Sequence, residues 1–177
     1  MKHLPNILTI LRLIACPILI YLFIFGTYLT ILIVFMLACL TDFFDGYLAR
    51  KENLKTSLGK YLDPIADKVL IITMCIILII NKDILGLHKL AFYIIILREI
   101  IITFLRLNLD NENKSIEVSK LSKYKTFMQM VAIGSILIYH NFELFYFELP
   151  TIILVWLAAF ITLITGIQHL KTYKNLK

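Results

Sequence analysis

Residues 41–67 read TDFFDGYLARKENLKTSLGKYLDPIAD and hold four aspartates between two long apolar stretches. On a helix, residues at positions i, i+3, i+4 and i+7 share one face. The first half of this stretch follows that spacing with Asp42, Asp45, Gly46 and Ala49. We therefore predict a helix that presents two carboxylates and two small residues on the same side.

The second half of the stretch repeats the arrangement, with Gly59, Asp63 and Asp67 at i, i+4 and i+8. Two helices joined by a polar loop over residues 51–58 are expected to aim four carboxylates at a common point. Converging carboxylates repel one another, and charge within a bilayer is costly. Hard divalent ions such as Mg²⁺ or Mn²⁺ prefer oxygen ligands and offset both costs. The pattern predicts a metal site.

A simpler interpretation of the same residues remains open. Asp63 could cap the N-terminus of a helix whose first residue is Pro64, with the other aspartates as solvated loop acids. That interpretation leaves the helical spacing of the acids and the two glycines unexplained.

Composition indicates a membrane protein built as one domain over residues 1–177. The hydrophobic share is 60% and the mean hydropathy is +0.85, against roughly 45–50% apolar residues in ordinary globular proteins. The cysteines sit singly inside apolar runs, so no disulfide framework is predicted. These are Cys16, Cys39 and Cys75.

The apolar runs predict an all-α polytopic membrane protein with six transmembrane helices, each close to the ~20 residues that a bilayer requires. The first run follows a basic start, as in a signal peptide, but Arg12 interrupts it and no small-residue cleavage site follows. We expect a retained helix with a short amphipathic start around Pro5 and Asn6. The expected spans are 1–25, 27 to the aspartate motif, 58–80, 89–109, 120–139 and 150–170.

Lys and Arg gather at the N-terminus, in the 50–60 loop, around 114–125 and in the C-terminal tail. The positive-inside rule therefore predicts that both termini and the aspartates face the cytoplasm, in the cell membrane. The net charge of +6 then reflects topology and attraction to anionic membrane lipid. No nucleic-acid-binding motif is present, and no nucleic-acid partner is expected.

The pattern D-x2-D-G-x2-A-R-x8-G-x3-D-x3-D resembles the signature of the CDP-alcohol phosphotransferases, without departure in residue type or spacing. This resemblance implies the helical membrane bundle of that family, and a homodimer, as its members typically form. The eight matching positions are Asp42, Asp45, Gly46, Ala49, Arg50, Gly59, Asp63 and Asp67.

The resemblance also implies roles for these residues. Two Mg²⁺ or Mn²⁺ ions are expected, held by Asp42, Asp45 and Asp63, with Asp67 as catalytic base and a shared metal ligand. CDP-diacylglycerol is the expected donor. Arg50 is expected to pair with phosphate, although an interfacial anchor of the positive-inside kind is an alternative. The implied nucleotide and pyrophosphate contacts are Asp42, Gly46, Ala49, Arg50 and Gly59.

Two later segments, LREIIITFLRL and SKLSKYKTFMQM, are similar to family members that use glycerol 3-phosphate as acceptor. A doubly charged acceptor needs a cationic pocket. Alternatively, Arg98 pairs with an acid inside the bundle while the lysines bind lipid headgroups. The predicted acceptor-phosphate residues are Arg98, Arg106, Lys123, Lys125 and Thr126.

The N-terminal helix carries a polar stripe of Asn6, Thr9 and Arg12 at every third position. The stripe either lines the active site or anchors the helix at the interface, and the sequence does not separate the two.

The resemblance thus implies transfer of a phosphatidyl group from CDP-diacylglycerol to glycerol 3-phosphate, with release of CMP. A family member with another acceptor is the alternative, such as one for cardiolipin, phosphatidylserine or phosphatidylinositol phosphate. Outside the family, a divalent-cation transporter could also gather intramembrane carboxylates, but it has no evident use for Arg50 or the two glycines. A membrane prenyltransferase normally needs more spans than this chain supplies.

Overall fold

The computed structural model describes residues 4–52, 57–80, 86–111, 120–142 and 145–176. For some positions inside the helices only the backbone is described. These are residues 4–6, 8, 43–52, 57–64, 107–111, 120, 123, 145 and 176.

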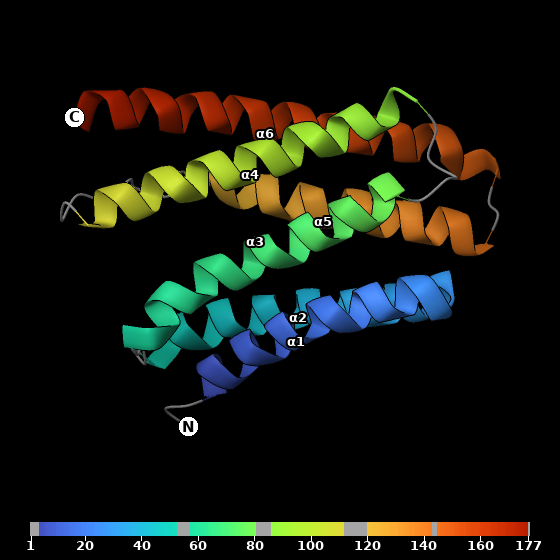
Figure 1. The fold of residues 1–177 in the computed structure, drawn as a ribbon, viewed down its shortest axis with the longest axis horizontal. Helices are drawn as coiled ribbons and strands as arrows, with labels where there is room; N and C mark the ends of the chain where they lie inside the picture. Colours follow the sequence, from blue (N-terminus) through green and yellow to red (C-terminus); the bar gives the residue numbers. More distant parts are fainter. Residues whose placement is uncertain (1–3, 53–56, 81–85, 112–119, 143–144, 177) are drawn as a thin grey trace.

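The described chain is helical, which confirms the predicted all-α class with six long helices (Figure 1). A short 3₁₀ turn, η1 (Phe145–Phe147), precedes the last helix. The helices are α1 (Leu4–Phe25), α2 (Tyr28–Glu52), α3 (Ser57–Ile80), α4 (His88–Asn111), α5 (Lys120–Phe142) and α6 (Glu148–Leu176).

Two local expectations differ from the structure, and one alternative is excluded. The alternative in which Asp63 caps a helix that starts at Pro64 is wrong, because α3 begins at Ser57 and both residues lie within it. Pro5 and Asn6 belong to the continuous helix α1 rather than to a separate entry segment. The last helix continues to Leu176, past the expected end near residue 170, because the polar tail keeps helical hydrogen bonding beyond the apolar run.

A tight turn sets α1 antiparallel to α2. A Cβ atom at Gly26 would lie 2.7 Å from the Leu22 carbonyl oxygen, so only glycine fits this position. The Thr27 hydroxyl accepts the backbone N–H of Thr30 at 3.3 Å, and the Thr30 hydroxyl accepts the backbone N–H of Thr27 at 3.1 Å. This reciprocal pair satisfies two otherwise open donors at the start of α2, as a capping box does.

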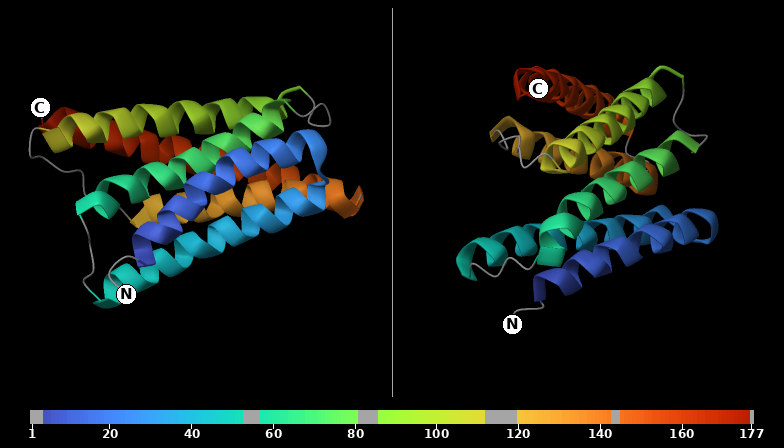
Figure 2. Two further views of the ribbon diagram at one scale, coloured as in Figure 1. Left: turned by 60° about the horizontal axis from the view of Figure 1, so that its bottom comes forward. Right: turned by 60° about the vertical axis from the view of Figure 1, so that its left-hand side comes forward.

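The helices pack in a closed circuit in the order α1, α3, α4, α6, α5, α2 and back to α1, and α3 also touches α5. Successive helices run in opposite directions, so the start of α1 and the end of α6 lie at the same end of the bundle (Figures 1 and 2). The ends of α2 and α4 and the starts of α3 and α5 lie there as well. The opposite end, where α1 turns into α2, is called here the distal end.

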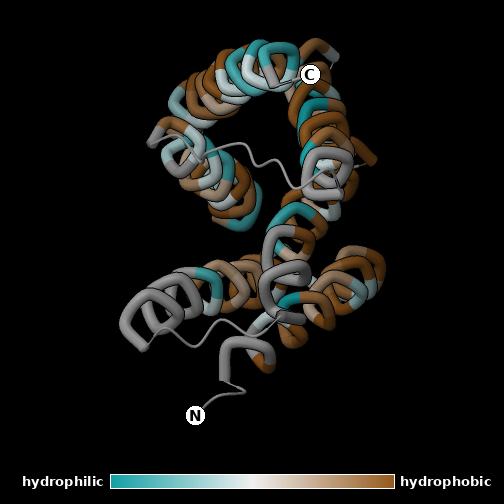
Figure 3. Tube along the Cα trace, turned by 90° about the vertical axis from the view of Figure 1, so that its left-hand side faces the viewer, coloured by the Kyte–Doolittle hydropathy of each residue, from teal (hydrophilic) through white to brown (hydrophobic). Residues whose placement is uncertain are grey.

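Apolar side chains fill the bundle and also cover its outside. Figure 3 looks along the bundle and shows hydrophobic stretches on every helix. Exposed Phe25, Phe104 and Ile153 illustrate an outer surface that suits lipid rather than water. The buried core includes Leu19, Phe35, Leu70, Met74, Leu78, Phe92, Leu137 and Ala158.

Helix length agrees with a membrane location. At 1.5 Å per residue a helix of 22 residues, the length of α1, spans about 33 Å, comparable with a hydrocarbon core of about 30 Å. Among the described residues, the stretch Glu148–Asn175 is by itself long and apolar enough to cross a membrane. Thr9–Phe25 and Tyr28–Asp42 form shorter apolar stretches.

Truncation of a core side chain should separate packing from surface hydrophobicity. Phe35 is 0% exposed and Phe104 is 64% exposed. Phe35→Ala should lower the free energy of unfolding by about 3 kcal/mol, because it leaves a cavity between packed helices. Unfolding in mixed micelles, followed by circular dichroism, measures the effect. Phe104→Ala is the matched control, and an equal loss in both variants would contradict the packing described here.

Candidate active site

Polar residues of the first three helices lie at one depth in the bundle. They are Arg12 on α1, Asp42 on α2 and Asp67 on α3. With a helical rise of about 1.5 Å per residue, all three lie about 20 Å from the distal end. The antiparallel packing therefore brings residues of distant sequence position to one level.

At this level Arg12 joins two of the predicted metal ligands. Its Nη1 lies 3.3 Å from Asp42 Oδ1, and the same nitrogen donates to Asp67 Oδ1. Arg12 is 1% exposed, whereas the Asp42 and Asp67 side chains are 29% and 33% exposed. The guanidinium is therefore buried, while both carboxylates remain partly open to an incoming ligand. One carboxylate of α2 and one of α3 therefore meet at the same guanidinium.

The donor chemistry of this pair fits a divalent metal. Asp42 and Asp67 supply hard carboxylate oxygens from two helices, the ligand type that Mg²⁺ and Mn²⁺ prefer. Among the side chains that the structure describes, no group of three or more His, Cys, Asp or Glu residues is close enough to hold an ion. The remaining predicted ligands fall outside that set.

For most of the motif, the structure describes the backbone and not the side chain. The first group lies on the continuous helix α2 and the second on α3, so the helices that their spacing requires are present. The predictions for the side chains of Asp45, Ala49, Arg50 and Asp63, and for the surroundings of Gly46 and Gly59, lie outside the described residues, as does the Lys123 side chain.

A second polar network joins α4, α5 and α6 around Glu99. Arg98 Nη1 donates to the two Glu99 oxygens at 3.2 and 3.3 Å. Lys125 Nζ donates to the same carboxylate, and Gln129 Nε2 lies 3.2 Å from Glu99 Oε1. All four side chains are buried. The Glu99 carboxylate therefore accepts hydrogen bonds from Arg98 on its own helix and from Lys125 and Gln129 on α5.

Threonines of α6 complete this network. Gln129 Nε2 also donates to Thr162 Oγ1 at 2.9 Å, and Arg98 Nη2 donates to Thr165 Oγ1 at 3.2 Å. A buried polar group without a partner is expensive in hydrocarbon, so these contacts bind the three helices together. The predicted residue Thr126 lies nearby on α5, and its hydroxyl donates to the Ser122 carbonyl at 3.4 Å.

Lys68 follows Asp67 on α3 and is within electrostatic range of both networks. It interacts with Arg98, Arg106 and Glu99 and also with Asp67. Arg106 Nη2 lies 3.5 Å from the His169 ring. The region between α3, α4 and α5 therefore carries more positive than negative charge among its described side chains, which favours an anionic ligand next to the Asp42–Asp67 pair.

The contacts of Arg98, Lys125 and Arg12 distinguish between the alternatives for these cations. Arg98 pairs with an acid inside the bundle, which is its immediate neighbour Glu99. Lys125 is 4% exposed and does not face lipid headgroups. In the N-terminal stripe, Thr9 and Arg12 are buried and face the bundle interior, which favours a lining role over an interfacial anchor.

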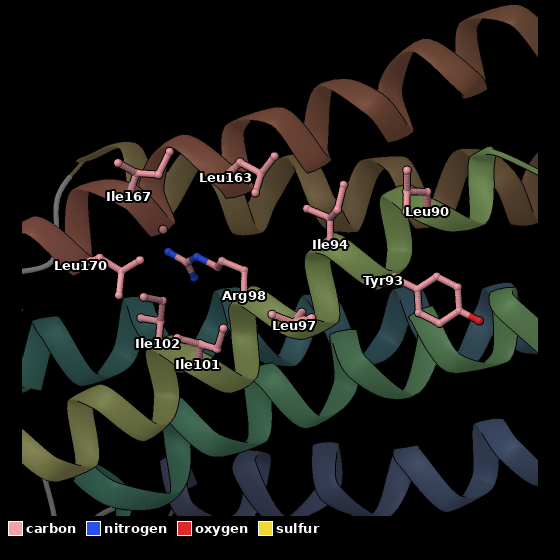
Figure 4. A pocket seen from close by; sticks show the side chains of 11 residues that line it. Leu90, Tyr93, Ile94, Leu97, Arg98, Ile101, Ile102, Leu163, Ile167 and Leu170 are labelled. Atoms are coloured by element: carbon pink, nitrogen blue, oxygen red, sulfur yellow. The ribbon is translucent and has the colours of Figure 1, made fainter.

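A groove of about 320 Å³ runs between α4 and α6. Its lining is apolar apart from the Tyr93 hydroxyl and Arg98, whose side chain points toward α6 (Figure 4). A Cβ atom at Gly166 would lie 3.0 Å from Arg98 Cγ, so glycine allows the arginine stem to pack against the α6 backbone. The lining residues belong to α4 and α6, so the groove is separate from the Asp42–Asp67 pair.

Several residues of these networks were not predicted as site residues, and for Arg12 a lining role was one of two open alternatives. Lys68, Glu99, Gln129 and the α6 threonines lie within or beside apolar stretches, where each polar side chain is a signal in itself. Counting residues from the distal end of each predicted helix puts many of these side chains at a similar depth in the bundle. Glu99, Gln129 and Thr162 lie about 17–21 Å from the distal ends of their helices, at the helical rise of about 1.5 Å per residue.

Comparison with known proteins places this geometry in a family. The model of the CDP-alcohol phosphatidyltransferase family matches residues 2–164. A Rickettsia typhi protein named CDP-diacylglycerol–glycerol-3-phosphate 3-phosphatidyltransferase is 41% identical, with 99% of each chain covered. Proteins of the same name from Haemophilus influenzae and Bacillus subtilis are 36% and 38% identical. The alignments cover 98% and 82% of this chain and 94% and 74% of those proteins. The chain therefore belongs to the CDP-alcohol phosphatidyltransferase family.

Proposed function

We propose that this protein transfers the phosphatidyl group of CDP-diacylglycerol to glycerol 3-phosphate, giving phosphatidylglycerophosphate and CMP. The observation that carries the proposal is that Asp42 and Asp67 both contact buried Arg12. The chain is also similar, over nearly its whole length, to an enzyme named for this transfer. Two carboxylates from different helices at membrane depth suit a reaction that joins a lipid to a water-soluble alcohol.

Asp42, Asp45, Asp63 and Asp67 are the residues proposed to hold two Mg²⁺ or Mn²⁺ ions. When bound, such ions neutralise pyrophosphate and the departing CMP phosphate. Asp67 is the proposed base and accepts the proton of the free primary hydroxyl of glycerol 3-phosphate. The acceptor oxygen forms a bond to the phosphatidyl phosphorus, and the bond from that phosphorus to the bridging oxygen of CMP breaks. Gly46, Ala49, Arg50 and Gly59 are proposed to contact the nucleotide and pyrophosphate.

The acceptor site is proposed to use the cationic residues beside the carboxylates. Lys68, Arg98, Arg106 and Lys125 belong to one electrostatic neighbourhood in which Glu99 is the paired carboxylate. Excess positive charge inside a membrane bundle is costly, and the phosphate of the acceptor offsets it. Arg106 is half-buried and therefore more accessible than Arg98 and Lys125, which bind Glu99. Lys123 and Thr126 remain proposed contacts on α5.

The orientation follows from the ends of the bundle. The start of α1, the end of α6 and the lysine-bearing ends of α2, α3 and α5 belong to one end (Figure 1). We place that end at the cytoplasmic face of the cell membrane, where both the CDP-linked donor headgroup and the soluble acceptor are reached. All six helices are proposed to cross the bilayer within a single domain, and the active form is proposed to be a homodimer.

An acceptor panel tests the function. Purified protein in detergent with lipid, Mg²⁺ and CDP-diacylglycerol should release CMP with glycerol 3-phosphate and remain inactive with serine or inositol phosphate. The readout is radiolabelled CMP together with the chromatographed lipid product. Release with another alcohol and not with glycerol 3-phosphate would reassign the acceptor within the family. Mn²⁺ flux into liposomes without CDP-lipid would instead indicate a transporter.

Replacement of the proposed base gives a second test. Asp67→Asn keeps the size of the side chain but removes proton acceptance, so kcat should fall about 10²–10⁴-fold, the range typical of general base catalysis. Glu148→Gln makes the same chemical change at an exposed position at the start of α6 and should retain activity. Wild-type turnover by a folded Asp67→Asn protein is incompatible with the assigned role.

The acceptor pocket is tested at Arg106. Arg106→Gln removes a charged hydrogen-bond donor worth about 1.5–3 kcal/mol. The KM for glycerol 3-phosphate should therefore rise about 10–100-fold, while the KM for CDP-diacylglycerol stays unchanged. Lys171→Gln, an exposed change on α6, is the control. An equal rise in both KM values, or no rise at all, speaks against this pocket.

A further inference from the structure

The proposed transfer assigns no chemical step to Arg12, yet Arg12 is among the most deeply buried charged residues that the structure describes. It lies on α1, one helical turn from buried Thr9. Burying a guanidinium is costly unless acceptors surround it. Its carboxylate partners come from α2 and α3, the two helices that pack against α1. Arg12 therefore occupies the position where these helices meet.

Both carboxylates contact one nitrogen of Arg12. Asp42 Oδ1 and Asp67 Oδ1 are paired with Nη1, although both residues are distant from Arg12 in sequence. Without a cation between them, two neighbouring carboxylates repel each other. Arg12 thus holds Asp42 and Asp67 close together from inside the bundle, beneath their partly exposed faces.

We propose that Arg12 is a positioning residue and a built-in competitor of the metal: it draws Asp42 and Asp67 together, and it limits how tightly divalent ions bind them. The inference rests on the proposed metal site. Arg12 thus has two opposite effects. It fixes the positions of the two carboxylates, and it lowers their affinity for divalent ions.

The sign of the effect on metal affinity follows from charge. A divalent ion bound by these oxygens is repelled by the guanidinium and must share oxygens that Arg12 already contacts. A neighbouring unit charge shifts the affinity of a carboxylate for a cation by about ten-fold or more, as it does for a proton. Neutralising Arg12 should therefore tighten metal binding by at least about ten-fold.

The experiment measures Mn²⁺ binding by electron paramagnetic resonance on the purified full chain, and thermal unfolding in EDTA. Arg12→Gln should bind Mn²⁺ at least about ten-fold more tightly than wild type. It should also unfold at a lower temperature in EDTA, because Asp42 and Asp67 lose their shared counter-ion. Added Mn²⁺ should then raise its unfolding temperature by more than it raises that of wild type.

Two variants complete the design. Arg12→Lys keeps the charge but places it on a more strongly hydrated ammonium, which pairs less well with carboxylates inside the bundle. Its Mn²⁺ affinity and its stability in EDTA should therefore fall between those of wild type and Arg12→Gln. This variant decides the question if Arg12→Gln does not fold. Lys171→Gln removes an exposed charge of α6 and should leave both measurements unchanged.

The outcomes separate the two proposals. If wild type binds Mn²⁺ and the Arg12 variants bind it equally well or more weakly, the role of Arg12 is overturned and the metal site stands. Wild type that binds no Mn²⁺ overturns the metal site and, with it, this inference.

Discussion

The ion pairs of Arg12 with Asp42 and Asp67 are the interaction on which the arrangement of the first three helices depends. Between helices in lipid, apolar packing gives little preference for one partner over another, because lipid tails are as apolar as leucine. Buried charge does give such a preference, since each unpaired ion is costly. Arg12 therefore specifies which faces of α2 and α3 turn toward α1, and those faces carry Asp42 and Asp67.

The other half of the bundle follows the same principle around Glu99. Its carboxylate holds Arg98, Lys125 and Gln129, and the threonines of α6 accept hydrogen bonds from two of these side chains. Each half of the bundle thus has its own charged centre at a similar depth, and Lys68 on α3 interacts with both. The proposed carboxylate site for metal and the proposed cationic site for phosphate are neighbours because α3 packs between α1 and α4.

Much of the fold follows from the sequence because its signals are periodic and long. Apolar runs separated by polar connections predicted six helices with ends close to those observed, and the spacing of the aspartates predicted helical faces. The Asp63–Pro64 pair shows where a local signal fails. The two residues resemble a helix start, but the helix had already begun at Ser57, and the spacing of Gly59, Asp63 and Asp67 was the better guide.

The partners of the buried charges could not be predicted in the same way. Arg98 pairs with Glu99, although adjacent residues on a helix do not usually face each other, and here the long arginine side chain turns back to reach it. Arg12 finds its acids on the next two helices of the chain. Such pairings depend on helix order around the bundle and on rotation about each axis, which the hydropathy of one sequence does not encode.

The most direct measurement of the central claim is the anomalous scattering of Mn²⁺ in crystals of the protein grown with a CDP-lipid. We expect metal density beside the carboxylates of Asp42 and Asp67, between α2 and α3. Metal density elsewhere in the bundle, or carboxylates that turn away from each other when the ion is supplied, would contradict that claim.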